Sequence, residues 1–285
     1  MNRQIFRTAC LLAYCGLLQA GAAHADESLE LITLINDYRE APGECEGRRV
    51  ESMGPLVPDD DLSRLRLASG DDWRAALQEI DYQAASAQAV VLSGLRDASA
   101  TMGALHQNYC QLLLDPQFAD IGVSREGNSW HLVLARPLLE DGLGDWQQAG
   151  QEILRQVNET RGAARRCGGE HFEAAPPLRW NEQLANAALA HSRDMADKNY
   201  FSHQGRDGSQ VSDRINREDY TWRQVGENIA AGQGSPSQAI SGWLASPGHC
   251  ANIMNPNYQE MGAAYALEPQ SDAAIYWTQV FATPR

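Results

Sequence analysis

Apolar positions recur with the period of a helix in three segments of the second half of the chain. These segments predict helices over residues 146–161, 182–198 and 235–245. Asn181 precedes the second helix and has the residue type of an N-cap, and Ser235-Pro236 combines a cap with a first-turn proline. One apolar stripe of the second helix consists of Leu184, Ala188, His191 and Met195.

Other segments have the composition of strands or belong to the first half. Residues 260–267 and 274–282 are apolar and aromatic, and they predict a pair of strands. In the first half, residues 29–38 and 85–95 predict helices and residues 131–135 predict a strand. Helices and strands in this mixed order are typical of a layered α/β fold.

Three sequence blocks occur twice, in the same order and without gaps. The matched pairs are Asn36 with Asn158, Arg39 with Arg161, Cys45 with Cys167, Pro55-Leu56 with Pro177-Leu178, Cys110 with Cys250, and Asp115-Pro116 with Asn255-Pro256. An internal repeat of this kind predicts two related domains. We place them at residues 26–140 and 145–285, with a linker near 138–144.

The N-terminus has the features of an export signal. Arg3 and Arg7 precede an apolar stretch over residues 9–18, and Ala23-His24-Ala25 has the pattern of a signal-peptidase site. We therefore expect residues 1–25 to be removed and the chain to be periplasmic or secreted. The apolar stretch is too short to span a membrane comfortably, and no later segment is a transmembrane candidate.

The charge of the chain excludes some partners. Its 285 residues have a formal net charge of −14, which argues against nucleic acid and against electrostatic docking on anionic lipid. The expected partner is an unidentified ligand or protein outside the cytoplasm.

Export also decides the chemistry of the cysteines. Four remain after removal of the signal, and an oxidising compartment would pair them in one of three ways. Only one pairing treats the two repeats alike. It predicts the disulfides Cys45–Cys110 and Cys167–Cys250.

The two halves differ between their cysteines, where the first half is shorter. It has no counterpart of Tyr200-Phe201-Ser202-His203 or of Gly226-Glu227-Asn228. One copy of the repeat therefore keeps its framework without these polar clusters. This difference favours a functional role for them in the second half.

The second half resembles the CAP superfamily of cysteine-rich secretory, antigen 5 and pathogenesis-related proteins, and in particular its bacterial SCP-like extracellular branch. The residues that support this resemblance are Leu178-x-Trp180-Asn181, His191-Ser192, Tyr200-Phe201-Ser202-His203, Gly226-Glu227-Asn228, Ser246-Pro247-Gly248-His249, Asn252-Ile253-Met254-Asn255-Pro256 and Tyr276-Trp277-Thr278-Gln279. The resemblance implies an α-β-α sandwich with a cleft at one end. With the repeat, it predicts two tandem CAP-like sandwiches, the first one smaller and degenerate.

The resemblance also suggests cleft residues. The family cleft has two histidines and two glutamates, and the first of each falls on His203 and Glu227. The second glutamate position is Ser246 and the second histidine position is Tyr276, so only half of this set is present. His249 is a candidate replacement imidazole. We expect Asn228 to tie the loop through backbone hydrogen bonds.

A carboxylate beside an imidazole orients the ring and raises its pKa. His203 and Glu227 could thus form a base and its orienting partner, could bind a divalent metal together with His249 or His191, or could simply fix a loop by bonding each other. His191 lies on an apolar stripe, which favours a core role. No serine-hydrolase, zinc-protease, phosphate-loop or dinucleotide motif occurs.

Three hypotheses follow. The leading one is an exported, non-catalytic binding module with a cleft for an envelope or lipid-like ligand. The second is a metal-assisted hydrolase or peptidase that uses the same cleft, although half of the family's set and any nucleophile motif are missing. The third is an interaction module in which the degenerate first half docks a protein.

Overall fold

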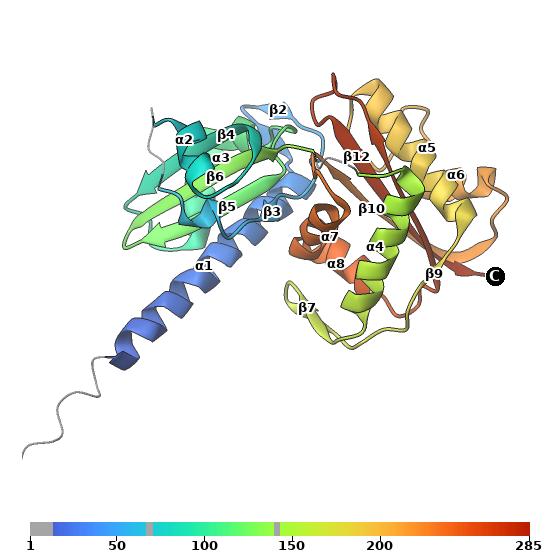
Figure 1. Cartoon of the computed structure of the whole chain (residues 1–285), viewed down its shortest axis with the longest axis horizontal. Helices are drawn as coiled ribbons and strands as arrows, with labels where there is room; N and C mark the ends of the chain where they lie inside the picture. Colours follow the sequence, from blue (N-terminus) through green and yellow to red (C-terminus); the bar gives the residue numbers. More distant parts are fainter. Residues whose placement is uncertain (1–13, 67–70, 140–142) are drawn as a thin grey trace, which may run out of the picture.

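The computed structural model describes residues 14–66, 71–139 and 143–285. The predicted signal therefore lies partly outside the described residues. Helix α1 (Tyr14–Glu40) passes through the predicted cleavage position, and its N-terminal part extends away from the rest of the molecule (Figure 1). Within the described ranges, no helix is long and apolar enough to cross a membrane.

The second half is built on a mixed four-stranded sheet. Its order is β10-β12-β11-β9, in which β9 runs parallel to β11 and the other neighbours are antiparallel. The strands are β9 (Arg179–Trp180), β10 (Trp222–Ala231), β11 (Glu260–Leu267) and β12 (Ile275–Pro284).

Helices cover both faces of this sheet (Figure 1). Ala263 and Tyr265 pack in one core, with helices on that face, whereas Ala264 between them packs in a second core beneath the other helices. This alternation is the period of a strand with both faces buried. The first face is covered by α4 (Trp146–Arg161), α7 (Pro236–Ala245) and α8 (Pro247–Met254), and the second by α5 (Glu182–Lys198) and α6 (Val211–Arg217).

The first half contains a sheet with the same strand order, β4-β6-β5-β3. One face is covered by α1 and α3, and the other by the short elements η1 and α2. The three-residue η1 stands where the second half has the 17-residue α5. The elements are β3 (Val57–Pro58), η1 (Leu62–Arg64), α2 (Trp73–Glu79), β4 (Ala84–Ser93), α3 (Ala98–Leu113), β5 (Asp120–Glu126) and β6 (Ser129–Pro137).

Each half has a glycine where a helical segment presses on the sheet. A Cβ on Gly262 would lie 2.0 Å from the backbone nitrogen of Ala185, and one on Gly122 would lie 2.2 Å from the carbonyl carbon of Leu62. Neither distance is compatible with a side chain. The two glycines occupy matching places in β11 and β5, so both sheets accept the same close crossing.

Buried arginines tie the framework together identically in both halves. Arg161 donates to the carbonyl oxygens of Pro176, Ile253, Asn255 and Tyr258. Arg39 donates to those of Gly54, Leu113, Asp115 and Phe118, which are the repeat counterparts. Asn158 and Asn36 likewise each exchange two hydrogen bonds with the backbone of a leucine, Leu178 and Leu56 respectively.

Two disulfides, Cys45–Cys110 and Cys167–Cys250, have the pairing that the repeat predicts. Each includes a cysteine from a small hairpin and one from a helix. The hairpins are β1 (Glu44–Cys45) with β2 (Arg48–Arg49), and β7 (Arg165–Cys167) with β8 (Glu170–Phe172). Each bridge closes a loop of more than sixty residues, which in the chain-entropy model stabilises the fold by roughly 4 kcal/mol.

One local prediction from the sequence was wrong. Residues 85–95, expected to be helical, form most of strand β4. Their alanines have high helix propensity, but they pair along the whole length of β6, and this pairing overrides propensity. Helix α7 ends at Ala245, as predicted, and Pro247 begins the next helix, α8, since proline is well suited to the first helical turn.

The halves pack directly on each other. Gln233 is fully buried, and its Nε2 donates to the carbonyl oxygen of Pro55 at 2.8 Å. Gln238 donates to the carboxylate of Asp120 at 3.2 Å. A Cβ on Gly54 would approach the backbone nitrogen of Ala231 to 3.0 Å, so the two backbones are also close there.

Candidate functional site

The structure brings His203 and Glu227 together. His203 lies in the loop after α5, and Glu227 lies on β10, an edge strand of the sheet. Nδ1 of His203 is 2.8 Å from Oε1 of Glu227. The two side chains differ sharply in exposure, at 49% for His203 and 3% for Glu227. A buried carboxylate therefore orients an imidazole that reaches solvent.

Arg214 completes this pair and was not anticipated from the sequence. It lies on α6, and its guanidinium donates to Oε2 of Glu227 at 2.6 Å. It also donates to the carbonyl oxygens of Ser209 and His203, so it fixes the loop as well as the carboxylate. The sequence offered one indication of its role. Arg214 lies between Tyr200-Phe201-Ser202-His203 and Gly226-Glu227-Asn228, the two clusters that have no counterpart in the first half.

Glu227 is ionised in this environment. Burial alone would raise its pKa, but the hydrogen bond to His203 and the charges of His191, Arg214 and His203 outweigh burial and leave the pKa lowered. Both carboxylate oxygens are engaged, one by His203 and the other by Arg214. Glu227 therefore acts on its surroundings through His203 and is not available as a nucleophile.

His191 is a core residue, as its apolar stripe predicts. It is 1% exposed, and its Nε2 is 2.9 Å from the carbonyl oxygen of Ser202, an arrangement that places the proton on Nε2. Burial lowers its pKa to about 4, against the opposing charge of Glu227. Its Nε2 is also 4.0 Å from Oε1 of Glu227, so it borders the pair from the interior.

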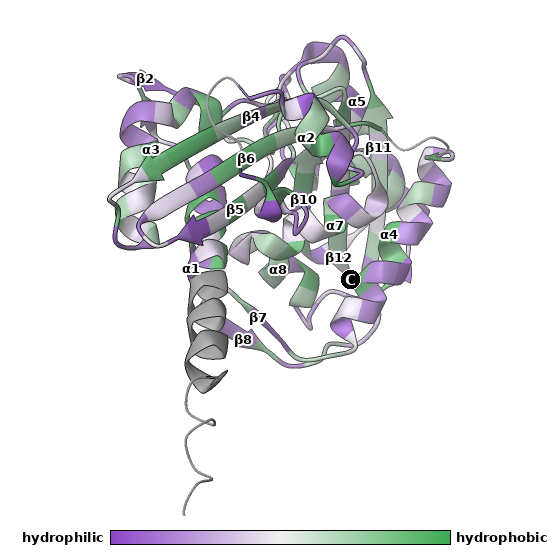
Figure 2. Cartoon of the chain, turned by 60° about the vertical axis from the view of Figure 1, so that its left-hand side comes forward, coloured by the Kyte–Doolittle hydropathy of each residue, from purple (hydrophilic) through white to green (hydrophobic). Residues whose placement is uncertain are grey.

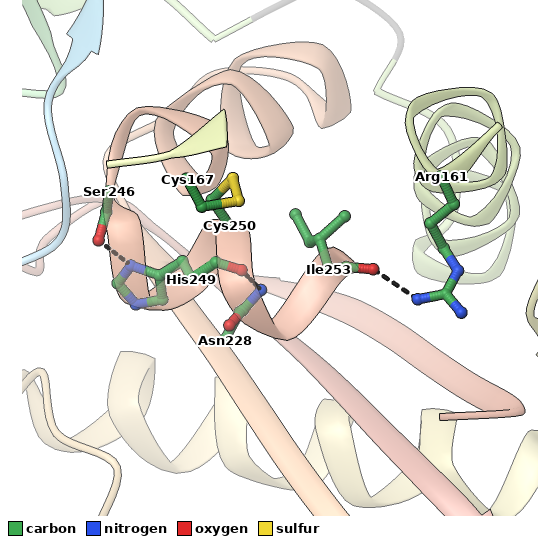
Figure 3. The surroundings of a disulfide bond; sticks show 7 residues. All are labelled: Arg161, Cys167, Asn228, Ser246, His249, Cys250 and Ile253. Carbon is green, nitrogen blue, oxygen red and sulfur yellow. Dashed lines mark hydrogen bonds between the residues drawn. A yellow bond between two sulfur atoms is a disulfide. The ribbon is translucent and has the colours of Figure 1, made fainter. Parts of the chain in front are cut away.

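His249 belongs to a second polar chain, which reaches the first half through Glu40. Figure 3 shows its contact with Ser246. Its Nδ1 is 2.8 Å from Oγ of Ser246, and that hydroxyl donates to Oε2 of Glu40 at 3.1 Å. Since the hydroxyl proton goes to Glu40, Nδ1 of His249 must be the donor, and Nε2 has the lone pair. Burial, with a smaller effect of His203, lowers the pKa of His249 to about 3. His249 is therefore neutral.

Glu40 supplies a carboxylate beside Ser246, at the position where the family pattern has its second glutamate. It comes from the end of α1 in the first half. A Cβ on Gly248 would lie 3.1 Å from Oε1 of Glu40, so the carboxylate sits directly on the start of α8. No local motif indicates such a contact, because the two segments are far apart in the sequence.

Asn228 is fully buried and ties α8 to the sheet. Its amide nitrogen donates to the carbonyl oxygen of His249 at 3.2 Å (Figure 3) and to Oε1 of Gln279 at 3.1 Å. Its oxygen accepts from Asn252. The contact with the His249 backbone fixes the position of that imidazole relative to β10.

Tyr276 is separate from the His203 pair. Its hydroxyl donates to Oδ1 of Asn199 at 3.2 Å, and the ring lines a hollow of about 180 Å³ together with Phe201 and Met53. Among the described residues no hydrogen bond joins it to His203, Glu227 or His249. The candidate cleft set is therefore divided between two neighbouring regions.

The donors do not fit a three-ligand metal centre. Within the described ranges, no three His, Cys, Asp or Glu side chains are grouped closely enough to hold a metal ion. Both oxygens of Glu227 and the Nδ1 atoms of His203 and His249 are already used in protein contacts. Only the Nε2 atoms of these two imidazoles remain, and a catalytic zinc usually needs three protein ligands.

Comparison with known families places a CAP domain in the second half. Residues 154–281 match the cysteine-rich secretory protein family, CAP. Over 105 residues the chain is 38% identical to "Uncharacterized protein YkwD" of Bacillus subtilis (strain 168), covering 37% of this chain and 39% of that protein. Over 104 residues it is 36% identical to "Uncharacterized membrane protein YlbC" of the same strain, covering 36% and 28%. The chain thus spans less than half the length of either relative.

Solved structures give more distant similarity. An extracellular protein containing an SCP domain from Bacillus anthracis str. Ames is 18% identical, with a TM-score of 0.42 over 77% of this chain and 75% of that chain. A cysteine-rich secretory protein from Staphylococcus aureus subsp. aureus Mu50 is 16% identical, with a TM-score of 0.38 over 56% and 52%.

Proposed function

Because residues 154–281 form a CAP domain, we propose that the chain is an exported binding protein without turnover. Its ligand, an envelope-derived or lipid-like molecule, is held at the cleft around His203 and Glu227. The observation that supports this function is that His203 is exposed to solvent while its partner Glu227 is buried. Glu227 is buried with both oxygens engaged, while half of the His203 side chain faces solvent.

This arrangement suits recognition. The carboxylate holds the proton on Nδ1 of His203, so Nε2 presents a lone pair to a hydroxyl or amide donor of a ligand. After protonation the same atom donates to an anionic group. Arg214 fixes the loop, so the ring is oriented before a ligand arrives. The alternative, a metal-assisted hydrolase, would need a nucleophile or a third metal ligand in the same cleft.

We also propose that residues 26–140 are a diverged copy of the domain at 145–285. The shared strand order and the matching arginine contacts support this. In this proposal residues 1–25 direct export, and the two disulfides fit an oxidising compartment. The first half then serves as a structural partner that presents Glu40 to the second.

The test is NMR of the chain from Asp26 onward, with its disulfides intact and its histidines labelled with ¹³C. Palmitate and a soluble muropeptide are titrated separately as probes. We expect at least one probe to shift the imidazole signal of His203, and His203→Ala to weaken its binding about tenfold, which corresponds to the loss of one good hydrogen bond to a charged group.

His171 provides a matched control. Its side chain is 52% exposed and lies 3.2 Å from a carboxylate, but that carboxylate, Glu173, is itself 86% exposed. His171→Ala should leave binding unchanged. Failure of both probes to bind would overturn the proposed ligand class. Conversion of either probe to product by the wild type but not by His203→Ala would establish the hydrolase instead.

A further inference from the structure

A second hollow, of about 920 Å³, lies at the junction of the two halves. The first half contributes the hairpin β1–β2, the end of α3 and one end of β6, and the second half contributes the loop between β11 and β12. Figure 1 shows β2 at this junction, and Figure 2 shows it as a hydrophilic strand. The Cys45–Cys110 disulfide anchors the hairpin, so this wall is fixed.

Three arginines face this groove without acceptors. Arg48 and Arg49 are exposed on β2, and Arg136 is half-buried near the end of β6. In the part of the chain that the structure describes, none of their three guanidinium groups makes a hydrogen bond or an ion pair with another residue. No nitrogen of these groups is buried without a partner, so all three are open to solvent in the groove. An anionic ligand there would find three free charged donors.

The two acidic side chains of the lining, Asp115 and Asp272, do not accept hydrogen bonds from these arginines. The carboxylate of Asp115 accepts from the backbone and side chain of Gln117. The carboxylate of Asp272 accepts from Asn199. The lining therefore holds three arginines against two aspartates, a local excess of one positive charge in a chain whose formal net charge is −14.

The repeat shows that the framework does not require these arginines. By the hairpin register, Arg48 and Arg49 correspond to Glu170 and His171 in the second half, and by the register of the central strands Arg136 corresponds to Thr283. The same fold is thus built with none of the three charges. Their convergence on one groove in the first half is a feature of that half alone.

We propose that this groove binds an anionic polysaccharide, with its phosphate or carboxylate groups held by Arg48, Arg49 and Arg136. Guanidinium groups form paired hydrogen bonds with both kinds of anion. The groove is open and bordered by two domains, which suits an extended chain. The inference rests on the export part of the proposed function and is independent of the His203 cleft.

The test is calorimetric titration of the chain from Asp26 onward at low salt. The probes are oligogalacturonate, which has carboxylates, and dextran phosphate, which has phosphates; neutral dextran is the uncharged control. We expect at least one anionic probe to bind, and the better one identifies the anion. Arg136→Gln and the double variant Arg48→Gln/Arg49→Gln should each weaken binding about tenfold or more, as expected for the loss of charged hydrogen bonds.

The double variant Arg96→Gln/Arg193→Gln tests whether a loss of positive charge elsewhere on the surface is enough to weaken binding. It removes two exposed arginines outside the groove lining. It should change affinity less than twofold, and His203→Ala should have no effect. The proposal is overturned if neither anionic probe binds, or if the control variant weakens binding as much as the groove variants do. Tighter binding of poly-glutamate than of either probe would overturn the choice of a polysaccharide, and loss of binding in His203→Ala would place the ligand in the cleft.

Discussion

The two halves place different residues on matching strands and helices. Glu227 pairs with Val280 across the sheet, and the matching pair in the first half is Ala89 with Val133. The next residue along the strand is Asn228 in one half and Val90 in the other. Helices α6 and α2 are both seven residues long, and their fourth residue is Arg214 in the one and Ala76 in the other. A sheet of this design therefore folds with alanine and valine where the second half has its buried polar cluster.

The difference extends to the segment that holds His203. The second half has the long helix α5 followed by the loop of His203, whereas in the described residues of the first half the three-residue η1 stands at the place of α5. The first half also has no sequence counterpart of Tyr200-Phe201-Ser202-His203 or of Gly226-Glu227-Asn228. The joint occurrence of these two clusters in one half indicates that they serve one purpose, and the shared framework shows what the fold itself requires.

The largest effect is expected from the shared framework. Arg39→Met and Arg161→Met should each lower the free energy of unfolding by more than about 4 kcal/mol, because each leaves several buried carbonyl groups without a donor. Urea unfolding with the disulfides intact measures this. Arg166→Met is the control, since Arg166 is exposed and its guanidinium donates to the carbonyl oxygen of Gly169. A small effect at Arg39 alone would contradict the equivalence of the two halves.

The next largest effect concerns the polar cluster. Glu227→Ala and Arg214→Ala should each cost about 3–5 kcal/mol in urea unfolding, because either change leaves a buried charge without its partner. The double variant, which resembles the first half at these positions, should cost about 2 kcal/mol less than the sum.

Glu173→Ala removes the exposed carboxylate beside His171 and should change stability by less than about 0.5 kcal/mol. Additive effects of the two cluster variants would contradict the interpretation that Glu227 and Arg214 form one coupled unit.

The smallest effect concerns a carboxylate at the junction. Asp120 is 1% exposed, and burial raises its pKa to about 7, although its hydrogen bond from Tyr82 opposes the shift. Since the unfolded state loses this proton near pH 4, the folded state binds more protons between about pH 4 and 7. The contribution of Asp120 to stability is therefore fully present at low pH and is lost as pH rises through 7.

Asp120→Asn should remove this pH-dependent loss. The free energy of unfolding of the variant, minus that of the wild type, should therefore be about 2 kcal/mol higher at pH 8 than at pH 5. Thermal or urea unfolding at the two pH values measures the difference. The control variant is Asp60→Asn, which alters an exposed carboxylate away from the junction. An opposite sign would mean that Asp120 is ionised at the junction.

Sequence patterns predicted those parts of the fold whose cause is local. The helices α4 and α5 have amphipathic periods and caps, and their observed bounds match the predicted ones. The repeat isolated the two clusters that contain His203 and Glu227, the family resemblance selected these two residues, and the structure places them in contact.

Features decided by distant contacts could not be predicted in this way. Strand β4 has alanine-rich composition, and only its pairing with β6 makes it a strand. Arg214 was missed because no spacing rule links α6 to β10, and Glu40 because it comes from the other half. In each case the deciding partner lies outside any local window.

The contact between Glu40 and Ser246 has a consequence for dissection of the molecule. In a fragment of residues 145–285 the Ser246 hydroxyl would have no carboxylate acceptor and could turn its proton toward Nδ1 of His249. The imidazole of His249 would then be free to adopt the other tautomer, with its proton on Nε2. In the whole chain Nε2 is a hydrogen-bond acceptor, whereas in the fragment it would be a donor. The CAP domain cut out of this chain is therefore chemically a different protein from the one that the whole chain contains.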